Sequence, residues 1–204
     1  MSAVDNLSTG RGLPPKREPV PPGVVFFAVK PDLEAAAGAA SVVRDLRYRY
    51  GLTGRALPPE RLHITLLPIG WFPELREGDI DTVKNAAAAI RVPPFEIVLD
   101  RVASFNGGSA RPVVMIGGTG TAETKILHRF LIEEMKRVGL FFRRMPHLTP
   151  HMTLLYDPRV IVEQPVAPVR WMVRELVLVH SHYRRSRHVS LAQWPLNGWS
   201  SSVH

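Results

Sequence analysis

The stretch Leu62-His63-Ile64-Thr65-Leu66-Leu67 returns as Pro150-His151-Met152-Thr153-Leu154-Leu155, so the pattern His-x-Thr-Leu-Leu stands twice in the sequence, from position 63 and again from position 151. The residue x is apolar in both copies. In an extended strand, residues i and i+2 lie on the same face. Each histidine is therefore predicted to share a strand face with its threonine, while the apolar residue between them packs on the other face.

The segments around the two motifs repeat as well, at the same offset of 88 residues. Each motif closes a predicted strand–helix–strand unit, with boundaries 24–29, 32–50 and from 62 in the first copy, and 113–116, 121–138 and from 151 in the second. We therefore predict an α+β fold of two duplicated sheet-and-helix lobes, related by pseudo-twofold symmetry, with a central cleft between them. The predicted helix 121–138 carries His128 on a charged face, so this side chain is predicted to be exposed.

Length and composition fit a single bilobal domain. The chain has 204 residues, and one domain of that size buries enough apolar surface to fold without covalent cross-links. Residues 1–22 hold five of the 19 prolines and few large apolar side chains, so they are predicted to form a disordered tail. The domain is predicted to span 23–196, with 171–182 and 188–194 as its closing strand pair, and 197–204 as a C-terminal tail.

The residue types exclude several classes of site. The sequence contains no cysteine, which excludes disulfide scaffolds, cysteine-ligated zinc sites, iron–sulfur clusters and thiol nucleophiles. Lysine and arginine outnumber aspartate and glutamate by 26 to 18, and this balance favours an anionic partner such as RNA or a phosphorylated small molecule. No apolar run reaches the ~18 residues of a membrane span, and the N-terminal segment lacks the apolar core of a secretory signal. A cytoplasmic location without a membrane partner is expected.

The two motifs supply groups for phosphodiester chemistry without a metal or cofactor. A neutral imidazole can take a proton from an attacking hydroxyl group or water, and a protonated one can give a proton to the leaving oxygen, so His63 and His151 are candidate catalytic residues. The hydroxyl groups of Thr65 and Thr153 are candidate phosphate ligands, because they can donate hydrogen bonds to the non-bridging oxygens, where charge increases in the transition state.

Less specific interpretations stay open. A single His-x-Thr in a strand is usually a half-buried hydrogen-bonded pair, but two copies at repeat-equivalent positions favour a functional role. A zinc site built on His63 and His151 would need a third ligand from elsewhere, since neither histidine has a carboxylate or cysteine at ligand spacing, and no metal is expected. A non-catalytic RNA-binding module of the same fold is the principal alternative to an enzyme.

At these motifs the sequence resembles the 2H phosphoesterase superfamily, which is named after its two His-x-Thr motifs. It is most similar to the bacterial 2'-5' RNA ligase-like branch, also called RNA 2',3'-cyclic phosphodiesterases. The resemblance covers 23–196 and includes the lead-in 58–66 and the closing segments 176–181 and 194–196. It implies the LigT-like form of the bilobal fold.

The resemblance also implies a reaction. It assigns His63 and His151 as catalytic residues and Thr65 and Thr153 as phosphate-binding residues. It implies that water opens a 2',3'-cyclic phosphate to leave a 2'-phosphate and that the reaction run in reverse with an RNA 5'-hydroxyl is 2'-5' ligation. The RNA-acting branch often has an arginine two residues before the second histidine, where this chain has Thr149. RNA with a cyclic phosphate end and a small cyclic nucleotide are therefore both candidate partners of an expected monomer.

Four further side chains are candidates for contacts with the substrate: Tyr156, Phe105, Tyr183 and Arg143. Tyr156 is predicted on the opposite strand face from Thr153, near the strand end, where its ring could stack on a base. Phe105 lies in a glycine-rich turn, and Tyr183 begins the most basic stretch of the chain, a combination suited to single-stranded RNA. Arg143 precedes the second motif and could steer a phosphate group. Edge packing and a solvated loop are the structural alternatives.

Overall fold

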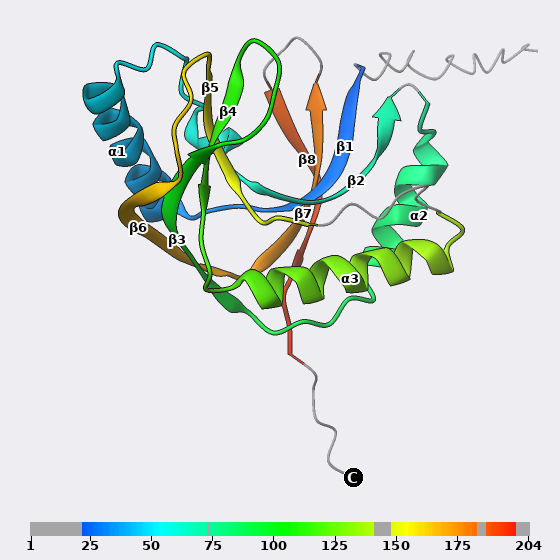
Figure 1. Cartoon of the computed structure of the whole chain (residues 1–204). Helices are drawn as coiled ribbons and strands as arrows, with labels where there is room; N and C mark the ends of the chain where they lie inside the picture. Colours follow the sequence, from blue (N-terminus) through cyan, green and yellow to red (C-terminus); the bar gives the residue numbers. More distant parts are fainter. Residues whose placement is uncertain (1–21, 73, 141–147, 183–186, 199–204) are drawn as a thin grey trace, which may run out of the picture.

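The computed structural model describes residues 22–72, 74–140, 148–182 and 187–198 of the chain. In this part of the chain, eight strands form one antiparallel sheet that curls into an open half-barrel with helices against it (Figure 1). The predicted tails 1–22 and 197–204 lie largely outside the described residues, and so do Tyr183 and Arg143.

The elements follow the chain in the order β1 (Gly23–Val29), α1 (Leu33–Tyr50), a short 3-10 helix (Pro59–Arg61), β2 (Ile64–Phe72), α2 (Glu77–Ala87), β3 (Phe95–Ser104), β4 (Arg111–Ile116), α3 (Thr121–Arg137), β5 (Met152–Asp157), β6 (Gln164–Val173), β7 (Glu175–His182) and β8 (Arg187–Pro195). The predicted strand–helix–strand units are β1-α1-β2 and β4-α3-β5, so both are confirmed.

Two residues set the ends of α1. The Asp32 carboxylate caps the N-terminus by accepting a hydrogen bond from the backbone N–H of Ala35 at 2.8 Å. Gly51 ends the helix in the left-handed conformation, with φ of 62°, which a residue without Cβ adopts at little cost. Between these ends, the helix buries a stripe of small and aliphatic side chains: Ala35, Ala36, Ala39, Val42, Val43 and Leu46.

The order of the strands across the sheet shows the duplication. It is β6-β3-β4-β5-β2-β1-β7-β8, so the two motif strands, β5 and β2, are neighbours at the centre. One half of the sheet, the first lobe, consists of β1, β2, β7 and β8. The other half, the second lobe, consists of β3, β4, β5 and β6. Each half has its motif strand at the seam, which confirms the two duplicated lobes predicted from the repeat.

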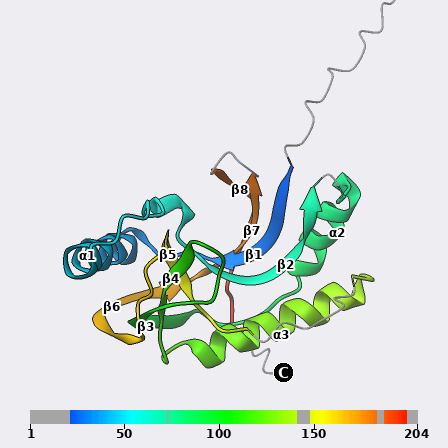
Figure 2. The same ribbon diagram turned by 45° about the horizontal axis from the view of Figure 1, so that its top comes forward.

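The helices hold the two lobes together because they pack across the seam. α1 connects β1 to β2 but packs against β6 and β5, and α3 connects β4 to β5 but packs against β2. α2 lies against α3 (Figure 2). The main core fills the space between these helices and one face of the sheet, and its fully buried side chains include Phe27, Leu66, Leu99, Met115, Leu127 and Leu154.

The sheet face opposite the main core is called the open face below. A second, smaller hydrophobic cluster lies on it. It consists of Phe26, Ala28, Val177 and Val179, with Val24 packed against it. The alternation along β1 explains the two clusters, since Phe27 enters the main core and Phe26 points to the open face.

The structure corrects two of the predicted elements, the strand 171–182 and the exposed position of His128. The predicted strand 171–182 is interrupted at Arg174: Trp171 belongs to β6, which pairs with β3, whereas β7 starts at Glu175 and pairs with β1. The apolar runs 171–173 and 176–179 are separated only by Arg174 and Glu175, and a polar pair of this length does not by itself show that a strand changes its partner. His128 is buried, with 8% of its surface exposed, because α3 packs against both β2 and α2.

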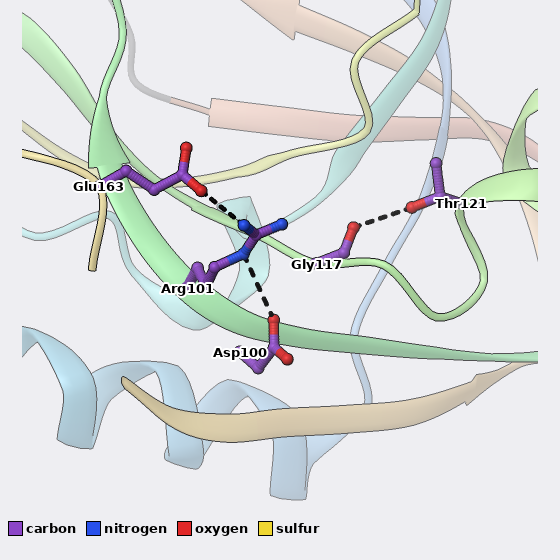
Figure 3. A network of polar contacts seen from close by, with 5 residues as sticks. All are labelled: Asp100, Arg101, Gly117, Thr121 and Glu163. Atoms are coloured by element: carbon purple, nitrogen blue, oxygen red, sulfur yellow. Dashed lines mark hydrogen bonds and ion pairs between the residues drawn. The ribbon is translucent and has the colours of Figure 1, made fainter. Parts of the chain in front are cut away.

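Polar contacts anchor the outer part of the second lobe (Figure 3). Arg101 on β3 forms an ion pair with Glu163, with 2.6 Å between Nη1 and Oε1, and its Nε lies 4.0 Å from Oδ1 of Asp100. At the start of α3, the Thr121 hydroxyl group donates a hydrogen bond to the carbonyl oxygen of Gly117 at 2.9 Å. These contacts tie β3 to the segment before β6, and α3 to the end of β4.

Candidate active site

The two motif histidines meet at the seam of the sheet. His63 immediately precedes β2 and His151 immediately precedes β5, and these two strands pair antiparallel at Ile64 and Met152. Ile64 and Met152 are completely buried. The histidines therefore flank a pair of core residues, and each is delivered to the seam by a different lobe.

The antiparallel register also brings the threonines to this point. Extended on either side of the Ile64–Met152 pair, it puts His63 opposite Thr153 and Thr65 opposite His151. All four of these polar side chains are partly exposed. The four residues predicted from the motifs therefore lie together on the open face, two from each lobe.

Each histidine is held in one orientation by its own backbone. Nδ1 of His63 lies 2.7 Å from the carbonyl oxygen of Arg61, and Nδ1 of His151 lies 2.7 Å from the carbonyl oxygen of Thr149. A carbonyl oxygen only accepts hydrogen bonds, so Nδ1 must carry the proton in both rings. Nε2 is then the nitrogen that is free to accept or give a proton in either imidazole.

A β-bulge follows each threonine and explains the paired leucines of the motifs. Leu66 in β2 and Leu154 in β5 are extra residues in the ladders to β1 and β4, because Ala28 pairs with Thr65 while Phe27 pairs with Leu67, and the second lobe repeats the shift. Both leucines of each motif are consequently buried.

The bulge corrects the predicted orientation of Tyr156. Strict alternation would turn this residue away from Thr153, but the extra residue restores the phase, and Tyr156 pairs with Pro112 on the open face. Its side chain is 50% exposed. Tyr156 therefore lies on the same face as the motif residues, at the end of β5.

Phe105 is also brought to the site, whereas two other candidates are not described. The Phe105 ring packs against His151, with 4.9 Å between ring centroids, and its backbone N–H donates a hydrogen bond to the carbonyl oxygen of Pro112 at 3.0 Å. The turn thus supplies an aromatic wall beside the second histidine. Tyr183 and Arg143 lie outside the described residues.

Two rings beside the first histidine were not predicted from the sequence. Phe26 stacks on His63, with centroids 5.0 Å apart and ring planes 29° apart. His188, at the start of β8, packs perpendicular to His63 at 5.2 Å and 72°. The adjacent residues Phe26 and Phe27 could have predicted an aromatic ring on the open face, because neighbouring residues of a strand point to opposite faces. His188 offered no such signal.

The surroundings of His63 favour its neutral form. Burial lowers the pKa of His63 below its ordinary value, and the nearby positive charges of Lys30, His151 and Arg61 lower it further, while the hydrogen bond to the Arg61 carbonyl oxygen raises it. His188 is affected more strongly: burial and the charges of His63, Arg61 and Lys30 lower its pKa to about 3. Burial also lowers the pKa of Lys30. His188 is therefore uncharged at neutral pH.

A pocket lies beside Lys30, just after the end of β1. It has a volume of about 380 Å³ and opens beside Lys30, with Val177, Ser190 and Gln193 among its lining residues. This volume is within the range of small-molecule sites. Lys30 lines this pocket, and its charge also lowers the pKa of His63, so Lys30 connects the pocket electrostatically to the first histidine.

Two kinds of feature are not found in the part of the chain that the structure describes. No three histidine, aspartate or glutamate side chains there are grouped closely enough to hold a metal ion. None of the helices described is both long and apolar enough to cross a membrane.

Comparison with known proteins gives consistent results. Residues 31–185 match the family model of the 2'-5' RNA ligase superfamily. An RNA 2',3'-cyclic phosphodiesterase from Archaeoglobus fulgidus is 32% identical over 132 residues, which cover 64% of this chain and 70% of that protein. Two solved structures share the fold. Escherichia coli LigT complexed with 3'-AMP has a TM-score of 0.68 at 23% identity, covering 86% of this chain and 98% of that chain.

The second structure is the protein TT0787 of Thermus thermophilus, with a TM-score of 0.69 at 22% identity, covering 86% of this chain and 99% of that chain. These likenesses confirm the predicted LigT-like form of the α+β fold. The family model covers most of the chain and includes both motifs. The chain therefore belongs to the 2'-5' RNA ligase superfamily of 2H phosphoesterases and is a homologue of an RNA 2',3'-cyclic phosphodiesterase.

Proposed function

We propose that this chain is a cyclic phosphodiesterase that adds water to a 2',3'-cyclic phosphate and leaves a 2'-phosphate, with His63 and His151 as its catalytic residues. The observation that carries the proposal is the pairing of the two motif strands at Ile64 and Met152. This pairing collects two imidazoles and two hydroxyl groups at one point of the open face. The Archaeoglobus fulgidus relative supports the substrate class, and the formal net charge of +8 suits an anionic substrate.

The proposed reaction uses the two free Nε2 atoms in opposite senses. Nε2 of one histidine takes a proton from a water molecule while the water oxygen attacks phosphorus. The bond from phosphorus to the 3'-oxygen breaks, and Nε2 of the other histidine, which starts protonated, gives its proton to that oxygen. Each histidine ends in the protonation state in which the other began, and proton exchange with solvent restores the pair. An RNA 5'-hydroxyl in place of water would give a 2'-5' linkage.

The neighbouring polar groups bind the phosphate in this proposal. The hydroxyl groups of Thr65 and Thr153 donate hydrogen bonds to the two non-bridging oxygens, whose charge increases as the water attacks. The Lys30 ammonium adds positive potential from the side of His63. The nucleoside attached to the phosphate extends over the open face, where Phe105, Tyr156 and the pocket beside Lys30 are available.

The test is hydrolysis, in excess chelator, of 2',3'-cyclic nucleotides and of an RNA oligomer with a 2',3'-cyclic phosphate end. We expect each substrate to give only the 2'-phosphate. His63→Ala and His151→Ala should each lower kcat/KM by about 10²- to 10⁴-fold, the usual contribution of one positioned acid or base. His128→Phe is the matched control, because it removes a buried imidazole from α3, which packs on the core side of the sheet and not on the open face.

Three outcomes would contradict the proposal. Equal turnover by the wild type and both alanine variants would show that the histidine pair is not catalytic. Salt-sensitive RNA binding with no turnover of any cyclic phosphate would identify an RNA-binding module instead. Loss of activity in chelator, restored by zinc, would identify a metal-dependent hydrolase. The relative kcat/KM for the oligomer and the nucleotides also shows which of the two is the better substrate.

A further inference from the structure

The first histidine belongs to a cluster of three rings, formed by Phe26, His63 and His188. The centroid distances are 5.0 Å between Phe26 and His63, 5.2 Å between His63 and His188, and 5.7 Å between Phe26 and His188. These nearly equal distances form a triangle, so His188 lies beside both of the other rings. It is close to perpendicular to each, at 72° to His63 and 77° to Phe26.

His188 reaches this position because the sheet curls. Its strand, β8, is separated from β2 by β1 and β7 in the sheet order. In a flat sheet the side chains of β8 and β2 would be roughly 14 Å apart, at about 4.8 Å per strand spacing. The curl brings β8 back to the 3-10 helix Pro59–Arg61, which leads into His63, and the two elements are in contact. The outer edge of the first lobe therefore folds over the catalytic candidate.

The second histidine has no corresponding neighbour among the described residues. His151 shares with His63 the hydrogen bond from Nδ1 to the carbonyl oxygen two residues earlier, and it has one aromatic neighbour, Phe105. The ring contacts of His63 include a second imidazole in addition to its phenylalanine. Within the described part of the chain the two halves of the site therefore differ, because His188 packs on His63 and no described imidazole packs on His151.

We propose that His188 is a positioning residue for His63: its ring, packed nearly perpendicular to the stack of Phe26 on His63, fixes the plane of the His63 imidazole and keeps water from its edge. The hydrogen bond to the Arg61 carbonyl oxygen restrains the His63 ring at Nδ1 only. Rotation about that bond would still move Nε2, and the two packed rings oppose this rotation. The kinetic part of this inference rests on the proposed function.

The packing has a consequence for the proton affinity of His63. The titratable and charged groups that face His63 are Lys30 just after β1, Arg61 of the 3-10 helix, His151 across the seam and His188 of β8. Burial is the largest cause of the lowered pKa of His63, and the ring of His188 supplies part of that burial. Removing this ring admits water to His63, so its pKa should rise toward about 6.5. A ring of similar shape should keep the pKa low.

The experiment compares His188→Ala with His188→Phe, and it reads His63 directly. NMR titration of the imidazole signals in the ligand-free protein gives the pKa of His63, whose signals are identified by their loss in His63→Gln. We expect His188→Ala to raise this pKa and His188→Phe to leave it low. His128→Phe is the control for replacing a buried histidine by phenylalanine elsewhere in the chain.

Steady-state kinetics on a 2',3'-cyclic nucleotide provide the second measurement. His188→Ala should lower kcat by about 10- to 100-fold, the cost of a slightly misplaced catalytic group, with KM within about threefold. The limb of its pH profile that reports His63 should move upward with the pKa of that residue. His188→Phe should restore kcat to within about threefold of the wild type. A merely structural loss would lower the amount of folded enzyme without moving the limb.

Two results would overturn this inference. The first is a His63 titration that is the same in His188→Ala as in the wild type. The second is a defect in His188→Phe as large as that in His188→Ala, because the nitrogen atoms of His188 would then matter and not the packing of its ring. The NMR titration needs no turnover, so it decides the role of His188 even if the proposed hydrolysis is not observed.

Discussion

The cross-strand partner of Ile64 in β2 is Met152 in β5, and this pair joins the two lobes. Both side chains are completely buried, so the core holds the pair from one face while the residues on either side of it point to the open face. A slip of one residue in a strand register exchanges its two faces. Such a slip would turn the motif histidines and threonines into the core. The apolar pair therefore fixes the strand register that keeps the motif residues on the open face, although both of its side chains lie in the core.

The threonines at the seam should contribute to the transition state and not to folding. We expect Thr65→Val and Thr153→Val, which keep the shape of the side chain and remove the hydroxyl group, to lower kcat/KM for a 2',3'-cyclic nucleotide by about 10²- to 10³-fold. Thr65→Ser and Thr153→Ser keep the hydroxyl group and should retain most of the activity. Wild-type kcat/KM in either valine variant would show that its hydroxyl group does not bind the reacting phosphate.

The half-buried imidazole of His188 should make the protein sensitive to acid. The pKa of His188 is about 3 in the folded state, against about 6.5 in an unfolded chain. Because the folded-state pKa is the lower one, the stabilising effect of neutral His188 is complete above pH 6.5 and is lost as the pH falls toward 3. Urea unfolding at pH 7.5, 6 and 5 should show this loss, and His188→Phe should show a smaller one. An identical pH dependence in the two proteins would contradict this expectation.

The sequence predicts the parts of the structure that depend on local patterning. The spacing of His63 and His151 reveals the duplication, and Asp32 and Gly51 mark the ends of α1. These features were predictable because strand alternation, helix caps and repeats act over a few residues or at a fixed offset.

The rest depends on how the sheet curls and where its ladders shift. The bulges at Leu66 and Leu154 change which face the following residues occupy, and an apolar Leu-Leu pair looks the same with or without a bulge. His188 reaches His63 only because β8 curls back toward the lead-in to β2. His128 is buried because α3 packs against both β2 and α2, and the charged neighbours of His128 on the helix do not indicate this packing. No local pattern carries these long-range contacts.

Asp157, at the end of β5, should be a major source of stability. Its side chain is completely buried and accepts hydrogen bonds from the backbone N–H groups of Thr53 at 2.8 Å, Gly54 at 2.7 Å and Arg159 at 2.9 Å. Asp157→Ala would leave three backbone donors without their acceptor, at a cost of about 1–3 kcal/mol each before relaxation. We expect its unfolding free energy in urea to fall by about 3 kcal/mol or more.

The matched control for Asp157 is Glu163→Gln. Glu163 also loses a charge in this variant, but its ion pair with Arg101 is about half exposed, with side-chain exposures of 49% and 48%. Exposed pairs contribute at most about 1 kcal/mol, so Glu163→Gln should change stability little. The pKa of Asp157 gives a second check: burial raises it, but the hydrogen bonds and Arg159 outweigh burial and lower it. Its stabilising effect should therefore persist until the pH falls below about 4, the ordinary value for an aspartate. Equal stability losses in the two variants would refute this role for Asp157.

Tyr156 should bind the base of the substrate. The bulge in β5 turns its ring to the same face as Thr153, at the end of the strand, with half of its surface exposed. Stacking of a base on an aromatic side chain contributes about 1–3 kcal/mol, so Tyr156→Ala should raise KM for a purine 2',3'-cyclic nucleotide by about 10-fold while kcat changes less than threefold. Tyr156→Phe keeps the ring and should behave like the wild type.

The substrate itself provides the decisive control for Tyr156. Ribose 2',3'-cyclic phosphate has the reacting group but no base, so Tyr156→Ala should leave its KM unchanged if the ring acts by stacking. A proportional increase in KM for both substrates would instead mean that Tyr156 shapes the phosphate site through the end of β5. The comparison is sharp because Thr153, three residues earlier on the same strand and face, should affect both substrates equally through the phosphate that they share.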